Sequence, residues 1–231
     1  MPRLLELFAG TGSIGRAFRE RGGEVVSLDI CQKGNPTIVA DILTWDERAF
    51  PQAHFDFVWG SPLCTYYSLA RSVKQSTPEE LTYADSLVKK TLQIVEYFAP
   101  VAWAFENPQT GRLKTRAFML ELGLPFKDVT YCKYGTRYKK QTRIWTNLGH
   151  HWQPRPVCCK DSRCEQFKDN RHPATAQRGP CRSSGAKRVG DDFTQNQLYH
   201  MPATWCDEIA RAAESALRER HDSQTSEATG S

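Results

Sequence analysis

The sequence has no long hydrophobic run, and this absence excludes several classes of protein. No stretch of the 231 residues approaches the roughly 18 apolar residues that a membrane-spanning helix needs. Residues 1–8 carry charge among their apolar side chains, which predicts a strand and not a signal peptide. The eight cysteines are spread unevenly, with four in residues 158–181, unlike those of a secreted disulfide scaffold. We therefore expect a reduced, intracellular protein, without an indication of nucleus or cytoplasm.

Acidic residues are scarce in one part of the chain. Residues 133–188 contain fourteen Lys or Arg and three Asp or Glu, although the whole chain carries a net charge of only +5. The rest of the chain is therefore net negative. A neutral-to-acidic body with one basic segment predicts a polyanion-binding region attached to a catalytic or structural core.

Short apolar runs alternate with helical patterns, which predicts an open, largely parallel α/β sheet with helices on both faces. The expected strands are 3–8, 24–29, 37–40, 55–59, 101–105, 128–133 and 143–147, and the main helices are 78–98 and 203–217. We divide the chain into a catalytic and cofactor-binding core (1–150), a small irregular basic Cys/His-rich insert (151–192), a segment returning to the core (193–218) and a disordered tail (219–231).

The first strand is followed by Gly10-x-Gly12-x-x-Gly15, a nucleotide-type glycine fingerprint that opens a helix. Asp29 lies at the end of the next strand, where a carboxylate can bind ribose hydroxyls. Asp41 follows the third strand and can bind an adenine amino group or simply cap the next turn. These residues do not by themselves show whether the ligand is a dinucleotide or S-adenosylmethionine. A glycine turn that binds no ligand is a third interpretation.

Two reactive side chains follow the next strands. Cys64 lies in a loop after Ser61-Pro62, where a thiol near helix N-termini can have a lowered pKa and act as a nucleophile. Glu106, in Glu106-Asn107-Pro108, can act as a general acid or as a hydrogen-bonding clamp, or merely cap a helix. The carboxyl ends of parallel strands bind ligands, so we expect these residues to meet at one edge of the sheet.

Taken in order, these motifs resemble the DNA cytosine-5 methyltransferases, above all the short phage and viral forms. The resemblance rests on Phe8-Ala9-Gly10-Thr11-Gly12, Asp29, Gly60-Ser61-Pro62-Leu63-Cys64 and Glu106-Asn107-Pro108, and spans about residues 3–147. It implies a Rossmann-like sheet that uses S-adenosylmethionine to methylate C5 of a cytosine flipped out of duplex DNA. Cys64 would add to C6 of the base while Glu106 binds N3 and the amine.

The resemblance implies roles for further residues and a monomeric enzyme. A weaker similarity near residues 199–217 suggests a closing segment that packs beside the cofactor pocket. Cofactor binding is expected of Phe8, Ala9, Gly10, Thr11, Gly12, Ser13, Gly15, Asp29, Ile30, Asp41, Ile42 and Pro62. Nucleic-acid binding is expected of Ser68, Arg137, Lys139, Lys140, Arg163, Lys168 and Arg171, mainly through phosphates.

The sequence departs from the family pattern at two places. Leu63 stands where a second proline is common before the cysteine. The family usually has Gln-x-Arg-x-Arg near residue 141, whereas this chain has only Arg143 there. We align Arg143 with the last family arginine, the alternative being the first, and expect it to be catalytic, with help from Lys139 or Lys140.

The cysteine-rich insert contains a candidate zinc site. Cys159, Cys164 and His172, together with Cys181 or Cys158, could supply four ligands for a structural zinc ion. Their spacing is irregular, so unrelated thiols are an equal alternative.

Three other functions stay open at this point. An RNA cytosine-5 methyltransferase would share the fold and the chemistry. A catalytically weak relative would bind DNA through the basic segment, and a nicotinamide oxidoreductase is suggested by the glycine fingerprint alone.

Overall fold

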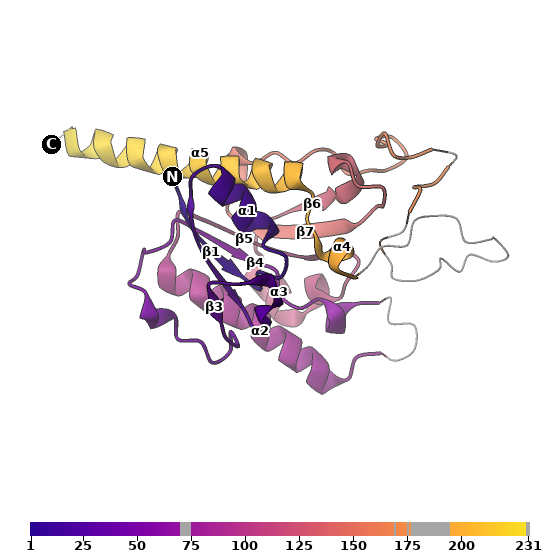
Figure 1. Cartoon of the computed structure of the whole chain (residues 1–231), viewed down its shortest axis with the longest axis horizontal. Helices are drawn as coiled ribbons and strands as arrows, with labels where there is room; N and C mark the ends of the chain where they lie inside the picture. The colour runs from indigo at the N-terminus through magenta and orange to yellow at the C-terminus, as the bar shows by residue number, and fades with distance from the viewer. Residues whose placement is uncertain (70–74, 169, 175, 177–194, 230–231) are drawn as a thin grey trace.

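The protein is built around a seven-stranded sheet (Figure 1). The computed structural model describes residues 1–69, 75–168, 170–174, 176 and 195–229. The strand order is β3-β2-β1-β4-β5-β7-β6. The strands are β1 (Arg3–Leu7), β2 (Glu24–Asp29), β3 (Ile38–Val39), β4 (Phe57–Gly60), β5 (Ala102–Pro108), β6 (Phe126–Thr130) and β7 (Gln141–Thr146). The helices are α1 (Ser13–Glu20), α2 (Pro78–Phe98), α3 (Ala117–Leu122), α4 (Gln195–Tyr199) and α5 (Ala203–Thr229).

The sheet is parallel apart from β7, which runs antiparallel to both β5 and β6. β1 pairs in parallel with β2 on one side and with β4 on the other, so the strand order reverses between β1 and β4. Open α/β sheets bind their ligands outside the carboxyl ends of the strands at such a point. The expected Rossmann-like, largely parallel sheet is confirmed, and its architecture predicts where the ligand lies.

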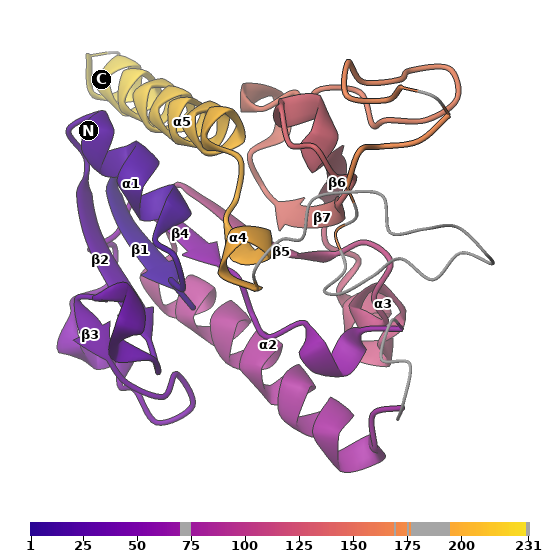
Figure 2. The same cartoon turned by 45° about the vertical axis from the view of Figure 1, so that its right-hand side comes forward.

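Helices cover both faces of the sheet (Figure 2). α1 and α5 pack side by side on one face, where Trp205 lies edge-on against Trp59 of β4 with ring centroids 5.8 Å apart. α2 covers the opposite face through Leu87, Ile94 and Phe98. Each buried side chain of this size contributes about 1.5–3 kcal/mol to folding.

α2 begins where the sequence predicts. Thr77 Oγ1 accepts the backbone N–H of Glu80, and the Glu80 carboxylate accepts the backbone N–H of Thr77, which together form a capping box. Pro78 occupies the first turn, where its missing N–H costs nothing. The long helix is therefore fixed by local chemistry at its start.

Two expectations about element boundaries differ from the structure. Residues 131–133, expected to continue a strand, belong instead to the 3₁₀ turn Tyr131–Tyr134 after β6, because the buried rings of Tyr131 and Tyr134 turn into the core under α5. The tail expected from residue 219 continues instead as helix α5 to Thr229. Side-chain hydroxyls there bond to carbonyls one turn back, as Ser223 does to Glu219.

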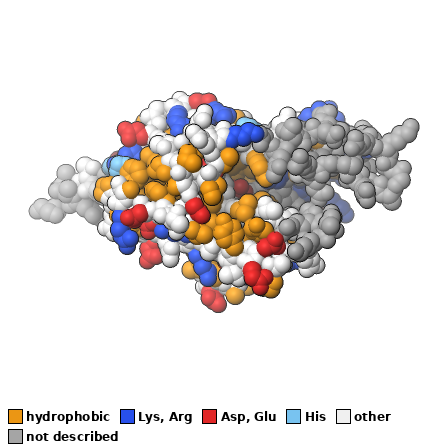
Figure 3. Space-filling view, turned by 60° about the horizontal axis from the view of Figure 1, so that its bottom comes forward, with side chains coloured by type: hydrophobic (Ala, Val, Ile, Leu, Met, Phe, Trp, Pro, Cys, Tyr) orange, Lys and Arg blue, Asp and Glu red, His pale blue; other side chains and the backbone are white. Residues whose placement is uncertain are grey.

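No described helix combines the length and the apolar character needed to cross a bilayer. One face of the molecule nevertheless gathers hydrophobic side chains near its middle, with most of the charged ones around them (Figure 3). Several large apolar side chains on the surface of the described residues are exposed, including Leu63, Tyr83 and Leu120.

A buried carboxyl group under the glycine loop predicts a pH-dependent stability. Glu6 of β1 is 1% exposed, and burial raises its pKa from 4.5 to about 7 despite nearby arginines. The folded state therefore binds this proton more tightly than the unfolded state does. We expect the contribution of Glu6 to the free energy of unfolding to decrease by about 3 kcal/mol as the pH rises from 4.5 to 7.

Urea unfolding of wild type and of Glu6→Gln at a series of pH values measures this contribution. The glutamine variant lacks the titrating group, so its stability should decrease less over that range. Glu24→Gln removes an exposed carboxylate of β2 and serves as the matched control. Parallel curves for wild type and Glu6→Gln would refute the prediction.

Candidate active site

A cavity of about 1360 Å³ opens at the carboxyl ends of the strands. It is large enough for a nucleoside-sized cofactor together with a second ring. Segments that follow β1, β2, β3, β4 and β5 all contribute to its lining. Most residues with expected cofactor or catalytic roles line the cavity: Phe8, Ala9, Gly10, Thr11, Asp29, Ile30, Asp41, Ile42, Pro62, Cys64 and Glu106.

The Asp29 carboxylate fixes the position of the glycine loop. Gly10 adopts φ +52°, a left-handed conformation that glycine adopts without strain. Its N–H donates to Asp29 Oδ2 at 2.8 Å, and the N–H of Cys31 donates to Oδ1 at 2.7 Å. The carboxylate thus joins the ends of β1 and β2, and its remaining lone pairs can accept ligand hydroxyls.

The other two glycines of the fingerprint have different roles: Gly12 precedes α1 in a left-handed conformation with φ +63°, and Gly15 allows close packing. Gly12 and Gly15 lie outside the cavity lining, and Gly15 is buried against β1, where a Cβ would collide with the Glu6 carboxylate. Ser13 is also outside the lining, and its hydroxyl bonds to Thr11 at 2.8 Å. These three residues affect the conformation of the loop without lining the cavity.

Gly34 belongs to the cavity wall although the sequence analysis did not single it out. A Cβ at this position would collide with the carbonyl oxygen of Gly10. Asp41, on the same side, accepts the N–H of Leu43 through Oδ1 at 2.9 Å, so it caps its own turn while also lining the cavity. Both alternatives given for Asp41 are therefore compatible with its position.

The segment before α5 returns to the glycine loop. Leu198, Tyr199, His200 and Met201 all line the cavity, and the N–H of Met201 donates to Ser13 Oγ at 3.3 Å. The position agrees with the closing segment suggested by the sequence.

The loops that carry Cys64 and Glu106 are fastened to each other. Asn107 is fully buried, and its Nδ2 donates to the carbonyl oxygen of Pro62 at 3.0 Å. This bond places the loop after β4 beside the end of β5. Cys64 begins a short 3₁₀ turn, and both it and Glu106 line the cavity.

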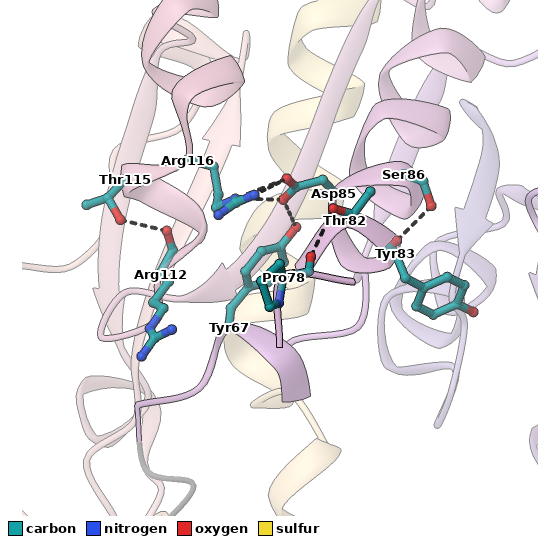
Figure 4. A network of polar contacts seen from close by, with 9 residues as sticks. All are labelled: Tyr67, Pro78, Thr82, Tyr83, Asp85, Ser86, Arg112, Thr115 and Arg116. Carbon is teal, nitrogen blue, oxygen red and sulfur yellow. Dashed lines mark hydrogen bonds and ion pairs between the residues drawn. The ribbon is translucent and has the colours of Figure 1, made fainter. Parts of the chain in front are cut away.

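A network on α2 anchors the loop that follows Cys64 (Figure 4). Asp85 Oδ1 accepts the hydroxyl of Tyr67 at 2.8 Å, and its two oxygens accept a bidentate pair of bonds from Arg116, Nε to Oδ1 and Nη2 to Oδ2. The backbone N–H of Arg112 donates to the carbonyl of Tyr67 at 2.9 Å. The segments after β4 and β5 are therefore both held on the same helix, which limits movement of the catalytic loops.

The electrostatics of the site depend on burial and on one lysine. Burial raises the pKa of the Cys64 thiol, and the charge of Glu106 raises it further. Burial also raises the pKa of Glu106, whose Oε2 has no hydrogen-bond partner among the described residues. Lys140 lowers both pKa values. The expectation of a lowered Cys64 pKa was wrong for the site without ligands, because desolvation and the carboxylate outweigh this cation.

Arg143 does not lie where the sequence analysis put it. Its guanidinium forms two 2.8 Å bonds with Asp128 and stacks over the ring of Phe126, and the residue does not line the cavity. β7 pairs with β5 so that Arg143 lies opposite Asn107, one position away from Glu106, and residues adjacent along a strand point to opposite faces. The catalytic assignment of Arg143 is therefore corrected.

Lys140 supplies the positive charge in its place. Its Nζ lies 3.4 Å from the carbonyl oxygen of Leu198 and 3.5 Å from the hydroxyl of Tyr131, above the Tyr131 ring. Lys140 lines the cavity, unlike Arg143. From the sequence, Lys140 was expected to bind nucleic acid and to assist Arg143.

The expected nucleic-acid residues fall into two groups. Ser68, Lys139, Lys140 and Arg171 line the cavity. Arg137, Arg163 and Lys168 lie outside the lining on exposed positions, and Arg163 stacks over Phe167. The first group can contact a bound base or its phosphates, and the second can contact only more distant parts of a polyanion.

Cysteine and histidine side chains gather at the opposite edge of the sheet from β3. The group consists of Cys132, Cys158, Cys164 and His172. It differs from the expected ligand set because Cys159 is exposed and points elsewhere, and Cys181 lies outside the described residues. Cys132 was missed, since it is separated from the others by a whole strand and no spacing rule links it to them.

We compared the chain with known proteins. No family model matches it. It is 33% identical over 180 residues to a Frog virus 3 (isolate Goorha) protein named probable DNA (cytosine-5)-methyltransferase, covering 73% of this chain and 80% of that protein.

Two solved structures resemble part of the chain. One is described as a putative DNA modification methyltransferase encoded within a prophage (E. coli), with 16% identity and a TM-score of 0.49 over 68% of this chain and 52% of that one. The other is the S. pombe Dnmt2 methyltransferase, with 15% identity and a TM-score of 0.46 over 63% and 50%. The chain thus spans about half the length of these two structures.

Proposed function

This chain belongs to the DNA (cytosine-5)-methyltransferase family, and on that premise we propose that it transfers a methyl group from S-adenosylmethionine to C5 of cytosine in duplex DNA through a covalent bond to Cys64. The observation that carries the proposal is that Cys64 and Glu106 line the same cavity. The hydrogen bond from Asn107 to Pro62 holds their two loops together. The glycine loop and Asp29 occupy the other part of the same cavity.

The residues of the cofactor half fit S-adenosylmethionine. At Gly10 a side chain would be strained by the positive φ, and at Gly34 a Cβ would collide with the carbonyl oxygen of Gly10, so both backbones stay accessible. Asp29 offers a carboxylate for ribose hydroxyls. Ile30 is exposed within the lining and can contact an adenine ring, and Asp41, which also lines the cavity, can bind the adenine amino group. When bound, this group supplies an activated methyl for transfer.

The protein residues then perform the activation of the base. C5 of cytosine is a poor nucleophile until a thiolate adds to C6, and Cys64 is the thiol in the cavity. After the methyl group is transferred, loss of the C5 proton to a base and departure of the Cys64 thiolate restore the 5,6 double bond. Glu106, whose pKa is raised by burial, can hold a proton for N3 of the ring and accept a hydrogen bond from the exocyclic amine. Lys140 favours the thiolate of Cys64 and balances charge beside Glu106.

The basic insert is the proposed DNA-binding part. Arg171 of the insert lines the cavity together with Lys139, which lies just before β7, and the exposed Arg163 and Lys168 lie in the insert outside the lining. Phosphate contacts of this kind give affinity without much sequence readout. The proposal keeps the division into core, insert and return segment, and it supposes a monomer.

Labelled S-adenosylmethionine tests the proposal directly. The full chain is incubated with duplex DNA, single-stranded DNA or total RNA, and the label in each nucleic acid is counted. Label should enter duplex DNA, and bisulfite sequencing should then show which cytosines are modified. Label entering RNA alone, or none of the substrates, would refute the proposal.

The position of Lys140 predicts a shift in the pH profile of kcat. Because this cation lowers the pKa of both Cys64 and Glu106, Lys140→Gln should raise both. We expect kcat to rise with pH as the Cys64 thiolate forms and to fall as Glu106 loses its proton. Both limbs of this curve should move to higher pH in the variant. At a given pH on the rising limb kcat should therefore decrease, because a smaller fraction of Cys64 is thiolate.

Lys139→Gln is the matched control, since this neighbour also lines the cavity but contributes to neither pKa. It should change the KM for DNA and leave both limbs in place. An unshifted profile in Lys140→Gln would show that the lysine does not act on the catalytic pair.

A further inference from the structure

Three thiols and one imidazole converge beside the end of β6, outside the catalytic residues. Cys132 follows that strand, Cys158 and Cys164 lie in the irregular segment after β7, and His172 comes from its far end. Their Sγ and ring nitrogen atoms all lie within 4.8 Å of one another. His172 Nε2 is 3.3 Å from the sulfur of Cys164 and 3.7 Å from that of Cys158.

The two sulfur–nitrogen separations are close to those of a metal-centred tetrahedron. With zinc–sulfur bonds of about 2.3 Å and zinc–nitrogen bonds of about 2.0–2.1 Å, neighbouring ligands in a tetrahedron lie roughly 3.5–3.8 Å apart. We propose that Cys132, Cys158, Cys164 and His172 bind one structural zinc ion. All four positions are then occupied by protein, which is typical of a structural and not a catalytic site.

The packing around this cluster supports a metal. The three cysteines are 3, 4 and 7% exposed and form a small buried group of their own, against which only Phe167 packs among the described hydrophobic residues. So few apolar contacts stabilise an irregular segment poorly. Metal binding supplies folding free energy to small segments of this kind.

Neighbouring hydrogen bonds hold the ligands on the sheet edge. The N–H of Cys158 donates to Thr130 Oγ1 at 2.9 Å, at the last residue of β6. Lys133 Nζ donates to Ser162 Oγ and to the carbonyl of Arg163, which fixes the turn between two of the cysteines. The ion would therefore join the insert to the sheet at a position that the backbone already prepares.

The proposed zinc site also supports one wall of the catalytic cavity. Arg171 and His172 both line the cavity, and Ala174 N–H donates to the carbonyl of Arg137 at 3.2 Å. Fixing His172 fixes the position of Arg171 next to it. Loss of zinc should thus raise the KM for DNA more than the Kd for S-adenosylmethionine, whose loops lie on other strands.

Metal content of the purified full chain tests the site without reference to activity. Wild type should contain about one zinc per chain by mass spectrometry of metals, and Cys158→Ser should contain at least about tenfold less. Cys159→Ser is the matched control, because this adjacent cysteine is exposed and outside the cluster, and it should keep its zinc.

A second measurement remains decisive if Cys158→Ser fails to fold. Chelator-treated wild type is titrated with Co²⁺, which should give the charge-transfer and intense visible bands of a tetrahedral thiolate site, and these should disappear when Zn²⁺ is added. The proposal would be overturned if wild type held no metal after exposure to zinc, or if Cys159→Ser lost as much zinc as Cys158→Ser. A disulfide among the three cysteines, or the absence of thiolate–cobalt bands, would also overturn it. Metal content is independent of methyl transfer, so a failure here is distinguishable from failure of the proposed function.

Discussion

Cys64→Ala is expected to reduce methyl transfer by at least about 10⁴-fold while leaving the affinity for S-adenosylmethionine nearly unchanged. The thiol lines the catalytic end of the cavity, whereas Gly10, Asp29 and Gly34 line the cofactor end. Without the thiolate, C5 of cytosine stays a poor nucleophile, however well both substrates are bound. Single-turnover transfer of labelled methyl to duplex DNA measures the loss.

Duplex DNA containing 5-fluorocytosine gives an independent readout of the same step. Fluorine at C5 blocks the final elimination, so wild type should remain attached to the DNA on a denaturing gel, and Cys64→Ala should not. Cys159→Ala, which changes an exposed cysteine, should form the adduct like wild type. An adduct that survives Cys64→Ala would identify another nucleophile.

Glu106→Gln is expected to lower kcat by about 10²–10⁴-fold. Its amide oxygen can still accept a hydrogen bond from the cytosine amine, but the side chain can no longer hold the proton for N3. Burial raises the pKa of Glu106, so in wild type the protonated form is lost, and activity decreases, as the pH rises through that value. The variant should lack this falling limb and retain the rising limb set by Cys64.

Measurement of kcat against pH for both proteins checks this expectation. Glu121→Gln removes an exposed carboxylate of α3, far from the cavity lining, and should behave as wild type. A profile of unchanged height and shape in Glu106→Gln would exclude the proposed acid.

The sequence by itself determined the layered α/β fold and most of the site. Strand ends are local features, and parallel strands bring all their carboxyl ends to one edge of a sheet. For this reason Gly10, Asp29, Cys64 and Glu106 could be placed in one site before any coordinates, and the structure puts all four in the lining of one cavity. The start of α2 was equally local, since a capping box needs only Thr77 and Glu80.

The tertiary structure alone decided which basic side chain faces the cavity and which cysteines meet. Neighbouring residues on a strand point to opposite faces, so the pairing of β7 with β5 decides the direction of Arg143, and that pairing is not written in the local sequence. Lys140, just before the strand, reaches the cavity instead. Cys132 joins Cys158 only because the chain after β7 folds back across the end of β6. Local patterns determine elements, whereas long-range pairing determines which side chains those elements bring together.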